Sequence, residues 1–171
     1  MDFFQVLRER HSIRSFTETP VEAEKLKAVL EAANLAPSAG NLQAYEIYCV
    51  TDGATLQALA EASFGQKFVG RAPVALAFCA HPGRADKYGS RGANLYCLQD
   101  ATIACAHAQL AVTALGLASV WVGAFDDDAV RRVLDIGAGL RPVAILPIGY
   151  AAKVSRATPR RPLSDLVHLF D

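Results

Sequence analysis

The sequence predicts an α+β fold, in which helices cover a sheet, within one domain that spans residues 1–171. Two predicted helices precede the first predicted strand, and the later helices and strands do not alternate regularly along the chain. A doubly wound parallel sheet would show a regular β-α-β-α order, so this pattern favours α+β layers. A length of 171 residues is also close to that of an ordinary single domain.

The N-terminal part of the chain is predicted to form two helices before a turn. Residues 2–9 read as a short helix, and residues 10–19 are polar and irregular. Apolar residues recur at helical spacing over 22–35, which predicts a second helix that Pro37 ends. Residues 36–41, with the sequence APSAGN, are typical of a turn.

The middle of the chain contains two strand patterns separated by a helix. Aromatic and β-branched residues predict strands at 44–51 and 74–80, and a helix is expected at 54–62. Residues 81–92 combine Pro, Gly and charged residues, a composition that predicts a mobile loop able to cover a substrate. A long helix over 93–115 follows, and the glycine after it is a typical helix-ending residue.

The C-terminal part is predicted to alternate strand, helix and strand before an irregular tail. These elements are a strand at 119–122, a helix at 127–134 whose N-cap is Asp126, and a strand at 143–150. The tail over 151–171 carries basic residues ahead of its first acid, namely Lys153, Arg156, Arg160 and Arg161.

Composition and charge exclude several classes of protein. Lys and Arg together number 17, as do Asp and Glu, so the formal net charge is zero. A general nucleic-acid binder needs a positive excess, and no nucleic-acid partner is therefore expected. The hydrophobic share of 52% excludes a disordered chain. In so short a chain, it also indicates apolar surface buried against a partner subunit or a cofactor.

No targeting segment, membrane span or metal site is expected. The N-terminus lacks the basic and apolar regions of a signal peptide, and the apolar stretch 93–122 contains Asp100 and His107. We therefore expect a buried soluble helix, in which Asp100 contacts backbone or a neighbouring helix. The four cysteines have neither C-x-x-C nor zinc spacing, which predicts reduced thiols in a cytoplasmic protein.

Catalytic motifs are missing from the sequence, and no catalytic residue is predicted. There is no G-x-S-x-G elbow, no H-E-x-x-H pair and no P-loop. One segment does have the composition of a phosphate site, because Arg10 and Arg14 flank Ser12. From the residues alone, this segment could equally be a solvated basic surface.

Four segments, taken in order, resemble the nitroreductase family of FMN-dependent oxidoreductases. They are RHSIRSF at 10–16, APSAGNLQ at 36–43, GLASVWVGAF at 116–125, and PIGY at 147–150 followed by RRPL at 160–163. The resemblance implies an α+β sandwich with a central, mostly antiparallel sheet flanked by helices. It also implies an intertwined homodimer with FMN at the subunit interface.

The resemblance assigns the cofactor-binding residues one by one. It implies that Arg10, Ser12 and Arg14 hold the FMN phosphate and ribityl chain, while His11 contributes backbone contacts. The tail residue implied to reach the phosphate is Arg160, or Arg161 if the register differs by one. The turn residues implied to lie against the isoalloxazine ring, from the other subunit, are Pro37, Ser38 and Asn41.

Three further residues are implied to lie near the flavin ring. Gly123 would let the backbone approach the ring where a side chain would collide, and Gln66 and Lys67 would lie near the pyrimidine edge. The sequence departs from the family's pattern at Ala44-Tyr45, where Pro-Trp is common, and at Ala124, where a second glycine is usual. Both departures could alter the slot around the ring.

The activity that the resemblance implies is hydride transfer from NADH or NADPH, through FMN, to a small planar acceptor such as a nitroaromatic or a quinone, in ping-pong order. A flavin carries this chemistry itself, which accounts for the missing acid–base motif. Two alternatives stay open. One is another flavin reaction of the same family, dehalogenase-like, flavin-consuming or peptide-oxidising, and the other is a non-catalytic flavin-binding sensor dimer.

Overall fold

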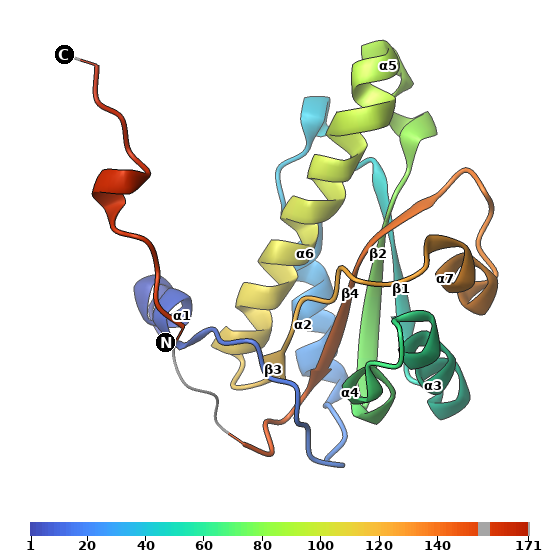
Figure 1. The fold of residues 1–171 in the computed structure, drawn as a ribbon, viewed down its shortest axis with the longest axis vertical. Coiled ribbons are helices and arrows are strands. Elements are labelled where there is room, and N and C mark those ends of the chain that lie inside the picture. Colours follow the sequence, from blue (N-terminus) through green and yellow to red (C-terminus); the bar gives the residue numbers. More distant parts are fainter. Residues whose placement is uncertain (154–157, 171) are drawn as a thin grey trace.

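The chain folds into a four-stranded sheet with helices on both faces, as a computed structural model shows (Figure 1). The structure describes residues 1–153 and 158–170, so Arg156 of the basic tail lies outside the described residues. The predicted α+β class is confirmed.

The sheet has the strand order β1-β2-β4-β3, and every neighbouring pair is antiparallel. Its strands are β1 (Tyr45–Val50), β2 (Val74–Ala80), β3 (Ala118–Ser119) and β4 (Arg141–Gly149). The two central strands, β2 and β4, supply most of the buried residues of the sheet, and Leu76 faces Leu146 in their register. The expected, mostly antiparallel sheet is therefore confirmed.

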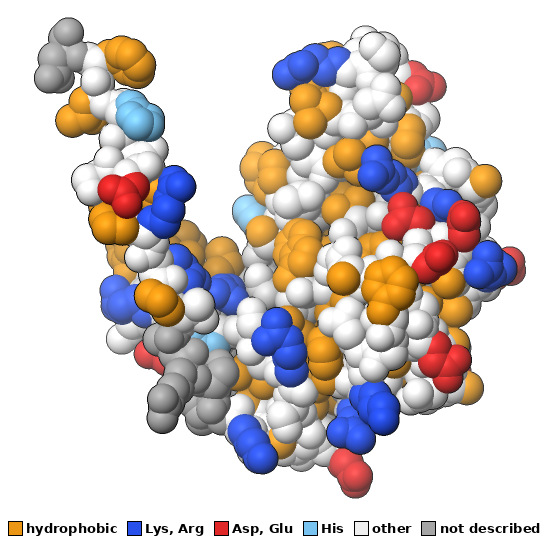
Figure 2. Space-filling model, in the orientation of Figure 1, with side chains coloured by type: hydrophobic (Ala, Val, Ile, Leu, Met, Phe, Trp, Pro, Cys, Tyr) orange, Lys and Arg blue, Asp and Glu red, His pale blue; other side chains and the backbone are white. Residues whose placement is uncertain are grey.

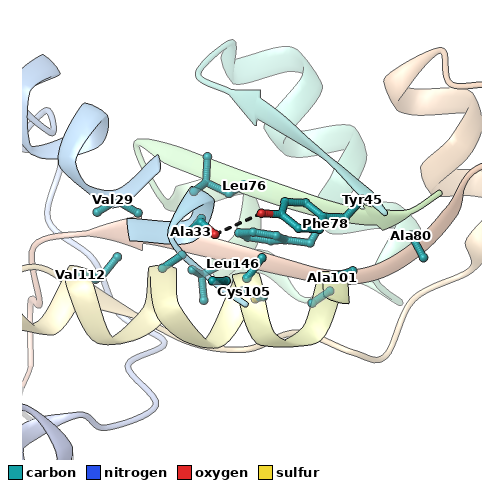
Figure 3. Close-up of a cluster of buried hydrophobic side chains, with 14 of the residues drawn as sticks. Val29, Ala33, Tyr45, Leu76, Phe78, Ala80, Ala101, Cys105, Val112 and Leu146 are labelled. Carbon is teal, nitrogen blue, oxygen red and sulfur yellow. Dashed lines mark hydrogen bonds between the residues drawn. The ribbon is translucent and has the colours of Figure 1, made fainter. Parts of the chain in front are cut away.

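Side chains alternate between the two faces of the central strands and build two separate cores. On one face, Leu76, Phe78 and Leu146 pack against α2 and α6 (Figure 3). On the other face, Ala77 and Ile145 pack against α3, α4 and α7. The two central strands are thus buried on both sides, and the long helix α6 covers one face of β2 and β4.

The helices begin and end where local chemistry indicates. Their bounds are α1 (Phe3–Glu9), α2 (Ala23–Asn34), α3 (Gly53–Ala62), α4 (Lys67–Arg71), α5 (Gly89–Arg91), α6 (Cys97–Ala114) and α7 (Asp127–Leu134). The carboxylates of Asp2, Asp52 and Asp126 accept hydrogen bonds from backbone N–H groups in the first turns of α1, α3 and α7. Gly116, with φ +73°, follows the end of α6 in the left-handed conformation expected of it.

The prediction of a mobile loop over 81–92 is wrong. This segment forms successive helical turns, η2 (Pro82–Tyr88) and α5, and a π-helical turn, η3 (Gly92–Tyr96), leads into α6. The reason is close packing: a Cβ at Gly92 would lie 2.1 Å from the carbonyl oxygen of Ala85, which is itself buried. Glycine here permits a tight contact between turns, so the composition gives no support to a covering loop.

Two other elements differ from the prediction. The five-residue helix α4 was not predicted, because it is too short to show a helical period. The expected strand at 119–122 pairs for only two residues as β3, after which Val122 forms an isolated bridge to Ile145. The chain nevertheless stays beside β4 as far as Val122, which exchanges both backbone hydrogen bonds with Ile145, and residues 123–126 then lead to α7.

Residues 158–170 extend away from the body of the molecule and contain the short turn η4 (Leu163–Asp165) (Figures 1 and 2). Large apolar side chains in this arm are open to solvent, with Leu169 81% and Phe170 97% exposed. Within the described ranges, none of the helices has the length and apolar character needed to cross a membrane.

Candidate functional site

The basic segment after α1 presents three of the predicted phosphate-binding residues on one face. Ile13 is buried and donates its N–H to the carbonyl oxygen of Ser119 at 3.0 Å, and Ser12 bridges to Ser119. In an extended segment, residues two apart point the same way. The side chains of Arg10, Ser12 and Arg14 are therefore held together on the face opposite Ile13.

The two arginines of this segment have no acidic partner within residues 1–153 and 158–170. Arg14 instead places its guanidinium 6.0 Å from the ring centre of Phe68 in α4. Guanidinium groups without a carboxylate partner can accept an anion through charge and paired N–H donors. The space-filling view shows Lys and Arg side chains over β3 and α4 on this face (Figure 2).

A second group of predicted residues lies at the junction of α3, α4 and the chain after β3. The side-chain amide of Gln66 donates to the carbonyl oxygens of Ala124 at 2.9 Å and Ser63 at 3.0 Å. Lys67 is the next residue and is exposed, and Gly123 precedes Ala124. Gln66, Lys67 and Gly123 are thus brought together, and the Arg14–Phe68 contact links them to the basic segment.

Gly123 is not required by the packing of its own chain. Of the side chains in the described part of the chain, a Cβ built there would meet only the indole of Trp121, 3.5 Å from Nε1, which is an ordinary contact distance. The backbone at Gly123 is also outside the left-handed region. The described residues therefore place no steric demand for glycine at this position, and a bound molecule could.

The turn between α2 and β1 holds the remaining predicted ring contacts, Pro37, Ser38 and Asn41. It contains the short 3₁₀ turn η1 (Ala39–Asn41), and three of its residues, Gly40, Asn41 and Gln43, have positive φ. The hydroxyl of Ser38 accepts the backbone N–H of Gln43 at 3.0 Å.

This turn is fixed to the N-terminal end of α6. The carboxylate of Asp100 accepts the N–H of Ala39 at 2.9 Å and that of Ala44 at 3.2 Å. The expected backbone contact of Asp100 is therefore confirmed. An open pocket of ≈ 600 Å³ lies beside the turn, lined in part by Pro37, Ser38, Tyr96, Leu98, Gln99 and Ile103.

The basic segment and the turn lie at opposite ends of α6. The turn contacts Asp100, near the start of the helix, while the basic segment pairs with Ser119, just past its end (Figure 1). At a rise of about 1.5 Å per residue, the helix between these points extends over roughly 20 Å. One chain thus carries two groups of predicted ligands that do not meet.

The tail arginines are not brought to either group by any described contact. Arg160 donates to the carbonyl oxygens of Thr158 and Pro159, and Arg161 donates to that of Asp165. His11 is half-buried beside the basic segment. The roles of Arg160, Arg161 and His11 therefore stay predictions.

Sequence reasoning missed Phe68, which contacts Arg14, and the hydrogen bonds by which Gln66 ties α4 to the chain after β3. The signal for Phe68 was weak, because the five-residue helix has no readable period. Among the described residues, no cluster of three or more His, Cys, Asp or Glu could hold a metal ion, and all four cysteines are free thiols.

Comparison with known proteins places these groups in context. Residues 7–67 and 62–150 match the model described as Nitroreductase family. The chain is 35% identical to a Thermus thermophilus protein named NADH dehydrogenase, over 93% of this chain and 91% of that protein. It is 31% identical to a Bacillus subtilis protein named FMN reductase (NAD(P)H), over 95% of this chain and 71% of that protein.

Solved structures give the same result. A Clostridium difficile protein described as an FMN-dependent nitroreductase superposes with a TM-score of 0.82 at 30% identity, covering 98% of this chain and 99% of that one.

Proposed function

The chain belongs to the nitroreductase family, and on this premise we propose that it is an FMN-dependent oxidoreductase. It takes hydride from NADH or NADPH and passes it to a small planar acceptor such as a nitroaromatic or a quinone. The observation that carries the proposal is the shared face of Arg10, Ser12 and Arg14, without acidic partners in the described chain and linked through Phe68 to Gln66, Lys67 and Gly123.

The residues present fit FMN at both of its ends. Arg10 and Arg14 supply charge-assisted hydrogen bonds for a phosphate, and Ser12 supplies a neutral donor. At the ring end, Gly123 leaves the backbone uncovered, and the Gln66 amide nitrogen already serves two carbonyl groups, which leaves its oxygen to accept from a ligand.

Bound FMN supplies the hydride chemistry, so the chain needs no acid–base pair of its own. What the chain contributes is binding, orientation and charge. Lys67 is exposed next to Gln66 and provides a positive charge where electron density on the ring would increase. Because the formal net charge of the chain is zero, the local positive charges of Arg10, Arg14 and Lys67 are what attracts an anionic cofactor.

The separation of the two ligand groups supports a homodimer. A turn that lies roughly 20 Å along α6 from the basic segment can complete a site only beside the basic segment of another copy. The exposed apolar side chains of the C-terminal arm and of α1, including Leu169, Phe170 and Phe4, offer surface for such a partner. The four free thiols fit a reducing compartment such as the cytoplasm.

The test of the activity starts from the purified protein. It should be yellow with an FMN spectrum, and anaerobic NADH or NADPH should bleach it within seconds, followed by reoxidation on adding a quinone or nitroaromatic. A colourless protein that does not bind FMN would refute the cofactor assignment. Yellow protein that neither nucleotide bleaches would favour the sensor, and loss of flavin absorbance under oxygen would favour the flavin-consuming branch.

The test of the shared site uses two inactive variants that are co-expressed with different tags. One carries Arg10→Ala and Arg14→Ala, and the other carries Ser38→Ala and Asn41→Gly, where glycine retains the positive φ of residue 41. A mixed dimer would hold one intact site, so random pairing should restore about a quarter of the wild-type activity. Activity that stays at the level of the separate variants would contradict a site built from two chains.

A further inference from the structure

Asp100 differs from the other acidic residues of the described chain because it is buried, with an exposed fraction of only 2%. It lies in the first turn of α6 and takes part in no ion pair among the described residues. Burying a carboxylate costs free energy unless hydrogen bonds replace its water. What replaces water here are two backbone N–H groups, both from the turn between α2 and β1.

The two hydrogen bonds hold the turn on either side of its residues with positive φ. One oxygen of Asp100 accepts from Ala39 and the other from Ala44, and Gly40, Asn41 and Gln43 lie between these points with positive φ. Non-glycine residues in this conformation cost about 1–2 kcal/mol each, less for Asn. A backbone of this kind persists only where its surroundings hold it in place.

A carboxylate suits this task better than any other side chain of its size. Ionised Asp has two acceptor oxygens and no donor, so it can accept one N–H with each oxygen. An amide of the same shape has only one acceptor oxygen. Its NH₂ group would face a backbone N–H, two donors cannot form a hydrogen bond, and one end of the turn would be released. The pKa of neighbouring Tyr45 is raised, first by burial and then by the nearby carboxylate of Asp100.

We propose that Asp100 is a positioning residue for the cofactor-facing turn: its two hydrogen bonds set where Ser38 and Asn41 stand against the flavin held by the basic segment of a partner chain. This inference rests on the proposed function. Asp100 acts through the turn and not on the ligand, so its removal should change how the flavin is held, in addition to any change in stability.

The experiment compares FMN-loaded wild type with two variants that break the same contact from opposite sides. Asp100→Asn keeps the shape of the side chain and loses one acceptor. Ala39→Pro leaves Asp100 intact and removes one donor, at the first position of a 3₁₀ turn after an extended Ser38, where proline is tolerated.

Asp52→Asn serves as the matched control. It makes the same carboxylate-to-amide change at a residue that also accepts a backbone N–H, that of Thr55 at 2.8 Å, in the first turn of α3 and outside both groups of predicted ligands. Its thermal stability should fall slightly, because a negative charge is lost at a helix N-terminus, while FMN affinity, visible circular dichroism, flavin midpoint potential and turnover stay as in wild type.

For Asp100→Asn and Ala39→Pro, we expect FMN affinity and kcat/KM for the acceptor to fall by about tenfold or more. The visible circular dichroism and the midpoint potential of the flavin should shift in both. If both variants keep wild-type flavin properties and lose only stability, Asp100 is a folding anchor and the proposal is overturned. If Asp100→Asn does not fold, Ala39→Pro alone decides. Wild type that binds no FMN would instead refute the proposed function.

Discussion

The substitution Gly123→Ala should affect protein stability and FMN binding in opposite directions. A Cβ at this position would lie 3.5 Å from Nε1 and 3.8 Å from Cδ1 of Trp121, and within residues 1–153 and 158–170 no other atom beyond its chain neighbours comes within 4 Å. The backbone is not left-handed there. The substitution should therefore leave the flavin-free protein as stable as wild type or stabilise it by about 0.4–1 kcal/mol, because alanine has less freedom in the unfolded chain.

FMN binding should respond in the opposite direction. If the flavin ring lies against the backbone of Gly123, an added methyl group must push it away, and crowding of this kind costs about 1–3 kcal/mol. At about 1.4 kcal/mol per factor of ten, FMN affinity should fall roughly 5- to 150-fold. The measurements are a fluorescence titration of flavin-free protein with FMN and thermal unfolding of the same flavin-free samples.

Substitutions at two other glycines serve as controls for Gly123→Ala. A Cβ at Gly139 meets nothing of the described chain within 4 Å, so Gly139→Ala should leave FMN affinity unchanged and, as at Gly123, leave stability unchanged or raise it by about 0.4–1 kcal/mol. A Cβ at Gly92 would lie 2.1 Å from the carbonyl oxygen of Ala85, so Gly92→Ala should destabilise the flavin-free protein. Wild-type FMN affinity in Gly123→Ala would refute the placement of the ring, and strong destabilisation of its flavin-free form would refute the packing argument.

Three further predictions concern the fold. Leu146→Ala, at a fully buried position between the sheet and α6, should cost about 2–5 kcal/mol of unfolding free energy in urea, whereas Leu35→Ala, at a site 79% exposed, should cost less than about 0.5 kcal/mol. Burial raises the pKa of Cys79 to about 12 and raises that of Cys105, so alkylation followed by mass spectrometry should label both thiols only after unfolding. The hydroxyl of Tyr150 donates to Glu22 and lowers its pKa below the usual 4.5. At acidic pH the unfolded chain therefore binds more protons than the folded chain. The contact stabilises the fold fully above the usual pKa of Glu22, and this contribution is lost as pH falls through the lowered pKa. Urea unfolding between about pH 3 and 6 should show that the free energy of unfolding changes less steeply with pH in Tyr150→Phe than in wild type.

Elements specified by neighbouring residues could be predicted from the sequence. The helix at 127–134 was predicted with its observed bounds, because Asp126 caps it and two more acids occupy its first turn. Strand β2 was likewise predicted at its observed bounds, since a run of seven buried residues is readable on its own. The basic segment was identified by composition, and its shared face follows from an extended backbone anchored at Ile13.

Features that depend on distant residues could not be predicted in the same way. The partners of Asp100 lie 61 and 56 residues away in the sequence, so the sequence indicated only that a contact should exist. The composition of 81–92 suggested a loop, because nothing local reveals that Gly92 is pressed against Ala85. The link from Gln66 to Ala124 similarly joins segments 58 residues apart.

If the proposed site is correct, the position of the two groups of predicted ligands along α6 connects cofactor binding with dimerisation. In a two-fold dimer with antiparallel α6 helices, the end of one helix lies beside the start of the other, so each basic segment would meet the partner's turn, and two identical sites would form. Neither site could exist in a monomer, because its halves stay roughly 20 Å apart. A cofactor that binds only where two chains meet must also stabilise their association. In such a dimer the apolar excess of this small, neutral chain would have a role, since its exposed arm and its cofactor slot would be buried in the same step.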